Sequence, residues 1–453
     1  MTSNARLSAL DASFLAVETP TAHMHVGWSA TLSAPAQGQL PSFPQLRDHI
    51  ERRLVRAPRY RQKLARVPLG LHAPEWVDDP AFSVDRHVYR AAGPLDDLAD
   101  EVMSMPLRRD RPLWEMWICE DIERQQIGLV GKAHHCMVDG IAAVELASLL
   151  LDPTPQPPDC SREDWHAAPE PSGERLLVRG VRDLVGAQLG LLRRPLRVLT
   201  SPAQTARKAA TGALQAVRAL SHSAYAAPAS VLNQELSPLR RLVRTQHPLE
   251  DLKAVKRAYG TTVNDVMLAA VAGAVRAYLI REGEQPVALK AMVPVNVRGS
   301  GDVLGNHISF VFADLPCDEP DPLIRLRRVH DTMSQRKRDG EHEGADLALK
   351  AAALTLPAVQ HSVSRFMASP RTFNLVVSNI PGPTEPLYML GCPLQATYPV
   401  VPLADGHALS VGMTTVRDLA CFGIYADRET LPNAAGLARD IDQALAELLA
   451  RAR

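Results

Sequence analysis

A dense polar stretch between two apolar segments limits what this chain can fold into more than any other feature of its sequence. The stretch is His134-His135-Cys136-Met137-Val138-Asp139-Gly140. The apolar run 127–133 before it is typical of a buried strand, and the apolar spacing of 141–151 after it predicts a helix. Polar groups between two core elements cost stability unless they are hydrogen-bonded or used in function. We therefore expect the histidines at the end of a buried strand, facing a loop.

The composition places the chain among globular proteins and excludes several classes. The chain is 46% hydrophobic and 22% charged, which is ordinary for a globular protein. Its 453 residues are enough for two domains. Lys+Arg and Asp+Glu are each 50, so the zero net charge indicates no nucleic acid partner. The six cysteines form no CxxC pair, which favours a reducing compartment over a disulfide framework or a zinc site. We find neither a signal-peptide core nor an uninterrupted apolar run of about 18–20 residues, so we expect a cytoplasmic protein, or one attached to a surface without spanning it.

The pattern along the chain predicts the α/β class, with two lobes and a linker. Residues 1–160 form the first lobe, 161–240 a helical, basic crossover, and 241–453 a second lobe of helices on a mixed sheet. Within the linker, residues 173–222 carry nine Arg or Lys against two acids. We favour a pair of helices that bridges the lobes; the alternative is an interfacial helix on an anionic lipid surface.

Local signals predict individual elements in both lobes. Residues 249–259 have helical spacing up to Gly260, and Thr262 is a suitable N-cap for a second helix. The basic residues between 52 and 66 are interpreted as a solvated helix face and turn, and 76–80 as a turn. Further predicted elements are strands at 23–32, 114–119, 287–297, 308–315, 373–380, 395–401, 408–417 and 420–426, and helices at 43–54, 95–105, 321–338, 344–367 and 434–449.

The histidine stretch has the residues for proton transfer, although a HisHis pair alone is also compatible with two polar residues at a strand end. An imidazole is the side chain best suited to accept a proton near neutral pH. Asp139 either orients His135 or pairs with a distant arginine, and Gly140 permits a close backbone approach. No HExxH, CxxC, GxSxG, GxGxxG or GxxxxGK[ST] pattern occurs. Histidine base chemistry without a metal or a serine nucleophile is therefore the prediction that remains.

The stretch also matches the HHxxxDG motif of the CoA-dependent acyltransferase superfamily. Further motifs occur in order along nearly the whole chain. They are Leu10-Asp11-Ala12-Ser13-Phe14-Leu15, Pro112-Leu113-Trp114-Glu115, Asn264-Asp265, Pro294-Val295-Asn296-Val297-Arg298, Gly305-Asn306 leading to Leu315-Pro316, and Ser378-Asn379-Ile380-Pro381-Gly382-Pro383. Together they resemble the bacterial wax ester synthase/acyl-CoA:diacylglycerol acyltransferase family. Each motif is short, but six in order make chance matching improbable.

The resemblance implies two chloramphenicol-acetyltransferase-like lobes with a tunnel between them. Acyl-CoA would be the donor substrate, with no further cofactor, and diacylglycerol or a long-chain fatty alcohol the acceptor. The products would be triacylglycerol or wax ester and free CoA. Peripheral contact with the inner membrane face or with lipid droplets would fit such substrates.

The resemblance also implies residue roles. His135 would be the general base and His134 a positioning partner, while Asp139 would brace the site through a salt bridge to Arg298. Developing negative charge on the thioester oxygen needs preorganised donors. Candidates are Asn264 and the pair Ser378-Asn379, although Asn264 and Asp265 are equally suited to cap their helix and brace the contact between the lobes.

The same observations are compatible with two other functions. One is an acyltransferase or condensation enzyme of the same fold that takes carrier-linked or other substrates. The other is a non-catalytic lipid-surface protein, against which the intact His135, Asp139 and Arg298 argue.

Overall fold

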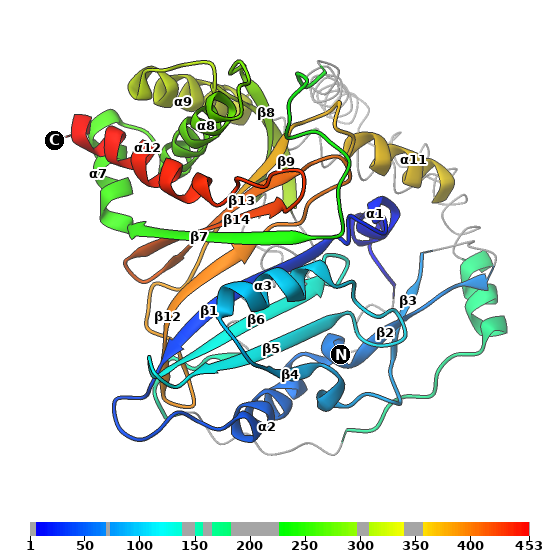
Figure 1. Cartoon of the computed structure of the whole chain (residues 1–453). Helices are drawn as coiled ribbons and strands as arrows, with labels where there is room; N and C mark the ends of the chain where they lie inside the picture. Colours follow the sequence, from blue (N-terminus) through cyan, green and yellow to red (C-terminus); the bar gives the residue numbers. More distant parts are fainter. Residues whose placement is uncertain are drawn as a thin grey trace, which may run out of the picture.

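A computed structural model describes residues 6–68, 73–137, 150–156, 165–182, 226–296, 308–338 and 357–452 of the chain. Two six-stranded sheets form two lobes, which lie one above the other in Figure 1. Helices cover the outer side of the second sheet, and the larger of the two main apolar clusters extends from the second lobe into the first. The α/β class with two lobes is as the sequence predicts.

The first sheet carries the histidine stretch at the end of one of its central strands. Its order is β11(Tyr388–Met389), β12(Cys392–Val400), β1(His25–Ser33), β6(Gln126–His134), β5(Trp114–Asp121) and β4(Val88–Ala91). Helices α2(Phe43–Arg53) and α3(Leu95–Ser104) belong to this lobe, together with the small sheet of β2(Gln62–Ala65) and β3(Glu75–Asp78). Strands β1 and β6 are antiparallel and place His25 opposite His134.

The second sheet is mixed. Its order is β7(Arg240–Pro248), β14(Leu419–Asp427), β13(Leu409–Val416), β10(Leu375–Ile380), β8(Leu289–Asn296) and β9(Ile308–Leu315). Strand β10 is parallel to both β8 and β13, and the other pairs are antiparallel. Helices α7(Leu249–Tyr259), α8(Val263–Arg281), α9(Pro322–Arg338) and α12(Gly436–Ala452) cover this lobe, while α1(Ala9–Val17) and α11(Pro357–Met367) lie together beside the contact between the lobes (Figure 1).

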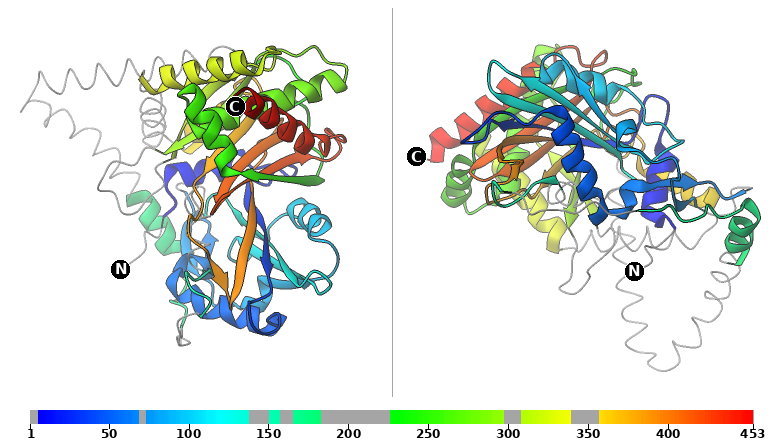
Figure 2. Two further views of the ribbon diagram at one scale, coloured as in Figure 1. Left: turned by 90° about the vertical axis from the view of Figure 1, so that its left-hand side faces the viewer. Right: turned by 90° about the horizontal axis from the view of Figure 1, so that it is seen from below.

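A strand exchange joins the two lobes. Strand β12 comes from the C-terminal part of the chain but pairs with β1 in the first sheet, so it runs from the upper lobe into the lower one (Figures 1 and 2). Pro399 of β12 also packs closely on the second sheet: a Cβ added at Gly412 would lie 2.9 Å from its ring, and one at Gly423 would lie 2.0 Å from its carbonyl oxygen. The predicted division into 1–160, 161–240 and 241–453 does not include this exchange.

Helix α8 is the apolar centre of the second lobe. Thr262 and Asp265 form the reciprocal N-terminal cap in which each side chain accepts from the other's backbone N–H, at 3.1 and 2.9 Å. Gly260 ends the preceding helix in the left-handed conformation, with φ of 66°. Within the described residues, α8 is the one helix long and apolar enough to cross a bilayer, yet most of its apolar window is buried against neighbours such as α9 and α12. The N-cap and the helix end predicted from the sequence are therefore confirmed.

Two local predictions were wrong or incomplete. Residues 76–80 do not begin as a turn, because β3 continues to Asp78. The basic run 52–66 is not wholly solvated: Arg53 is buried and paired with the buried carboxylate of Asp152. Strand β7 and helix α1 were not predicted. The helix expected after Gly140, and residues 183–225 of the basic linker, lie outside the described residues; residues 173–182 are helical.

Candidate active site

His135 stands at the first position after β6, where backbone hydrogen bonds from two sides hold the chain. The N–H of His134 donates to Leu113 O at 2.9 Å, and the N–H of His135 donates to Met24 O at 3.0 Å. Met24 has a positive φ of 50°, which a non-glycine residue adopts only where its surroundings require it. The backbone of His135 is therefore fixed by the segment that leads into β1.

The ring of His135 lies flat on Phe14 of α1. The ring centroids are 3.7 Å apart and the planes differ by 13°. Ser8 caps α1 by accepting from the N–H of Asp11 at 3.0 Å. Phe14 orients the imidazole, a role that the sequence reasoning did not assign, although Phe14 is part of the motif 10–15 that carried the resemblance.

His134 is buried and neutral. Its side chain is 1% exposed, and burial, followed by the charges of Arg109 and His135, lowers its pKa well below the usual value. Its Nδ1 accepts from the N–H of Cys136 at 3.1 Å, and a guanidinium nitrogen of Arg109 lies 3.5 Å from its Nε2. This Nε2 lies 3.8 Å from a carboxylate oxygen of Glu18, which also pairs with Arg109. His134 thus ties the strand end to neighbouring segments and does not line the cavity described below.

Two further histidines continue inward from His134. The centroids of His25 and His134 are 6.4 Å apart, and those of His23 and His25 are 5.2 Å apart. Burial is the main cause that lowers the pKa of His25 well below the usual value, with the Lys132 charge next. The sequence did not reveal this row, because it depends on the register of β1 against β6.

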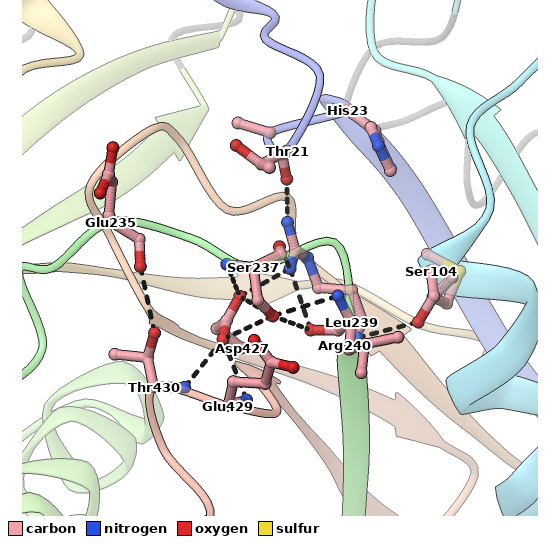
Figure 3. A network of polar contacts seen from close by, with 12 residues as sticks. Thr21, His23, Ser104, Glu235, Ser237, Leu239, Arg240, Asp427, Glu429 and Thr430 are labelled. Carbon is pink, nitrogen blue, oxygen red and sulfur yellow. Dashed lines mark hydrogen bonds and ion pairs between the residues drawn. The ribbon is translucent and has the colours of Figure 1, made fainter.

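An ion pair from the second lobe holds the loop before β1 (Figure 3). Arg240 and Asp427 are both buried, with an N–O distance of 2.8 Å, and Arg240 also donates to the carbonyl of Thr21. Figure 3 shows Thr21 above the guanidinium and His23 close by on the same segment. The pair therefore fixes the loop that leads to Met24 and, through it, to His135.

Backbone groups of β7 complete this contact between the lobes. The N–H of Arg240 donates to Ser104 Oγ at 2.8 Å, and the N–H of Leu242 donates to Asp100 Oδ1 at 2.7 Å. We call Thr21, Asp100, Ser104, Arg240 and Asp427 the interlobe seam.

A cavity of about 310 Å³ lies between the lobes, and His135 is part of its wall. Apolar side chains from both sheets and from α1 and α11 make up most of the remaining wall. The first sheet contributes Ala30, Leu129 and Leu394 to the wall, and the second lobe contributes Met292, Phe310 and Phe373. Such a space suits an aliphatic chain and excludes charged groups.

The structure brings one predicted oxyanion donor to this cavity and leaves others away from it. Ser378, in the C-terminal half of β10, lines the cavity, as His135 does. Asn264, Asp265 and Asn379 are not among the described residues that line it. Asp265 instead caps α8, as the alternative prediction for this residue stated, and its Oδ2 lies 2.8 Å from His330 Nδ1.

Three predicted site residues lie outside the described residues. These are Asp139, Gly140 and Arg298. The salt bridge between Asp139 and Arg298 stays a prediction.

Within the described residues, no group of three or more His, Cys, Asp and Glu side chains is placed to hold a metal ion. Among the described residues, the cavity wall offers one imidazole, that of His135, and several hydroxyl groups, of which Ser378 is the one predicted from the sequence. An imidazole there is suited to remove a proton from a hydroxyl group, and a nearby hydroxyl to donate to a developing oxyanion.

Comparison with known proteins identifies relatives along the whole chain. The family model described as wax ester synthase/diacylglycerol acyltransferase catalytic domain matches residues 7–267, and the WS/DGAT C-terminal domain model matches residues 304–449. The probable diacylglycerol O-acyltransferase tgs1 of Mycobacterium tuberculosis is 35% identical over 462 residues, covering 98% of this chain and 96% of the relative.

Solved structures with a similar fold also cover nearly the whole chain. A wax ester synthase/diacylglycerol acyltransferase from Marinobacter aquaeolei superimposes with a TM-score of 0.71 at 28% identity, covering 99% of both chains. The trichothecene 15-O-acetyltransferase of Fusarium sporotrichioides shares the fold, with a TM-score of 0.61 at 14% identity over 99% of this chain and 94% of that one.

Proposed function

The chain belongs to the wax ester synthase/diacylglycerol acyltransferase family, and from this premise we propose that it transfers a fatty acyl group from acyl-CoA to the hydroxyl of diacylglycerol. The products are triacylglycerol and free CoA. Long-chain fatty alcohols are a second acceptor class, which would give wax esters. The proposal adopts the activity that the names of its relatives state.

The observation that carries the proposal is the position of His135 on the wall of the apolar cavity. Both substrates of the proposed reaction bear long aliphatic chains, and the cavity is lined mainly by apolar side chains of both lobes. The reacting atoms are a hydroxyl group and a thioester carbonyl, which need a base and an oxyanion donor. His135 and Ser378 are the described polar side chains on this wall that supply these groups in our mechanism.

The proposed mechanism is direct transfer. His135 takes the proton of the acceptor hydroxyl while its oxygen attacks the thioester carbonyl, and Ser378 donates to the oxygen on which negative charge develops. The carbon–sulfur bond then breaks, the ester forms, and the thiolate of CoA takes up the proton held by His135. No acyl-enzyme forms, because binding both substrates side by side supplies the advantage of proximity.

The surrounding groups act on the position of His135. Phe14 and the carbonyl of Met24 hold its ring and backbone, and neutral His134 anchors the strand end. We extend the proposal to Asp139 and Arg298, whose salt bridge would brace the loop after His135. Acyl-CoA is a substrate in this scheme, and we propose no other cofactor. We place the reaction in the cytoplasm, at the inner membrane face or a lipid-droplet surface, where diacylglycerol is found.

The test is release of CoA from hexadecanoyl-CoA with diacylglycerol or hexadecanol, measured with a thiol reagent and confirmed by mass spectrometry of the lipid product. The His135→Ala variant should lose activity roughly 100- to 10,000-fold, the usual contribution of a general base. His166→Ala, which changes an exposed histidine, is the matched control and should keep full activity. Full activity of His135→Ala would refute the base assignment, and no ester from any acceptor would refute the transfer reaction.

A further inference from the structure

Trp28 is the largest side chain that the first sheet presents to the cavity. It lies in β1 between two cross-strand neighbours, opposite Gly131 of β6 on one side and Pro399 of β12 on the other. All three residues line the cavity. The indole therefore lies on the middle of the sheet, in the part of the cavity that β1, β6 and β12 line, which we call the first-lobe arm.

The indole occupies this place because residue 131 is a glycine. A Cβ added at Gly131 would lie 2.6 Å from Cε2 and 2.7 Å from Cζ2 of Trp28, closer than atoms can pack. The ring therefore lies directly over the backbone of Gly131. A tryptophan at 28 and the absence of a side chain at 131 form one matched pair.

The register of the strands places this pair between His135 and the far end of the arm. Gly131 is four residues before His135 on β6, roughly 13 Å along a strand that rises about 3.3 Å per residue. Beyond it, Ala30 and Leu129 face each other across the same two strands and also line the cavity. An aliphatic chain that extends from His135 into this arm meets the indole before it reaches Ala30.

We propose that Trp28, seated over Gly131, narrows the first-lobe arm and sets the length of the aliphatic chain that this arm accepts. The inference rests on the proposed function and adds a specificity-determining residue to it. The aliphatic chain in this arm belongs either to the acyl donor or to the acceptor, because both substrates carry aliphatic chains of the same chemistry. The experiment separates the two sources by varying one chain while the other is kept constant.

The first arm of the experiment varies the acyl-CoA from octanoyl to eicosanoyl with one diacylglycerol, and the second varies the acceptor alcohol with one acyl-CoA. Trp28→Ala should raise the kcat/KM ratio of long over medium chains by roughly 10-fold or more in one series only, as expected when a hydrophobic pocket gains space. Trp28→Phe should lie between the two. Trp117→Phe removes an indole from the same sheet that does not line the cavity and should leave both profiles unchanged.

Gly131→Ala tests the pairing itself. In the wild-type background the new methyl group collides with the indole, so the variant should lose stability or long-chain activity. In the Trp28→Ala background the same change should have little effect, because the collision is absent. Equal effects of Gly131→Ala in both backgrounds would show that the two sites are independent.

A binding measurement keeps the inference testable if Trp28→Ala does not fold or the proposed reaction fails. Stearic acid brominated at mid-chain should quench the tryptophan fluorescence of the wild-type protein and of Trp117→Phe, and should lose most of this quenching in Trp28→Phe. Undiminished quenching in Trp28→Phe, or identical chain profiles in all variants, overturns the inference. If the wild-type protein is quenched and Trp28→Phe is not, but no CoA is released, the proposed function is refuted and the chain-binding arm is still supported.

Discussion

The two faces of the first sheet have opposite character, although they belong to the same strands. On the cavity face, Ala133 and Gly131 leave room that Trp28 only partly fills. On the opposite face, the ammonium group of the buried Lys132 donates to two carbonyl oxygens at 2.7 Å, those of Val102 and Met105. One face lines a cavity that can bind a ligand, and the other face is packed and hydrogen-bonded to the neighbouring segment.

The difference shows how this molecule separates binding from positioning. The Lys132 ammonium on the opposite face and the ion pair of Arg240 and Asp427 in the interlobe seam are satisfied internally. Buried polar groups that are satisfied in this way fix geometry strongly. The cavity face has few directional contacts, so a chain can slide along it. The reactive imidazole stands where the two meet, since its backbone is held through Met24 while its ring lines the cavity.

The largest effect should come from breaking the seam. Asp427→Ala leaves the guanidinium of Arg240 buried without its carboxylate, which should cost about 3–5 kcal/mol of unfolding free energy. Asp427 also accepts from the backbone N–H groups of Ser237 and Thr430, which adds to the loss. Urea unfolding measures it.

The matched control for the seam is the more exposed pair of Arg281 and Asp440. Asp440→Ala should change the unfolding free energy by about 1 kcal/mol or less. Replacing both seam partners, as in Arg240→Met with Asp427→Leu, should recover much of the lost stability. Equal losses for Asp427→Ala and Asp440→Ala would contradict the contrast between the seam and the surface.

Substitutions that add methyl groups to one face or the other should have a smaller effect on stability and should distinguish the two faces. Gly27→Ala should destabilise the protein by about 1–3 kcal/mol, because the new Cβ would lie 2.7 Å from Gly131 O and 3.0 Å from Met103 Cε. Ala133→Val fills part of the cavity and should leave stability unchanged or raise it by up to about 2 kcal/mol. Its activity should fall, because the added bulk stands in the chamber. Thermal unfolding and CoA release measure the two effects, and similar stability losses would mean that the faces are packed alike.

The smallest effect on stability should come from a change of pH. The pKa values of His25 and His134 are lowered by burial in the folded protein, so below the ordinary value of about 6.5 the unfolded chain binds protons that the folded chain excludes. Stability should therefore be fully present above pH 6.5 and decline as the pH falls, by up to about 1.4 kcal/mol per pH unit for each group. Unfolding of His25→Gln, compared with wild type between pH 7 and 5, should show a shallower decline. An unchanged slope would place the titration elsewhere.

Local signals in the sequence predicted the elements that these comparisons depend on, but not their partners. The cap at Thr262, the end at Gly260 and the strand up to His134 follow from residue preferences and apolar spacing. Strand β7 was missed because its arginines do not alternate with apolar residues as in a half-buried strand. Helix α1 is short and carries a mixed pattern.

The site was predicted in part for the same reason. The histidine stretch and Ser378 carry recognisable motifs, whereas Trp28 over Gly131 and the row from His23 to His134 exist only through the register of β1 against β6. Alternation identifies a strand and its faces, but it does not say which strand lies beside it. Strand β12 is the clearest case, since nothing in its sequence indicates that it leaves its own lobe.

The position of β12 has a consequence for biosynthesis. Strand β1 is made at residues 25–33, yet its partner on one side is not synthesised until residues 392–400. A nascent chain therefore carries an unpaired β1 edge for most of its translation, and open edges are where chains aggregate. The first lobe cannot be completed on the ribosome ahead of the second, so the protein must mature as one unit, and truncated transcripts would yield an N-terminal half with an unprotected edge.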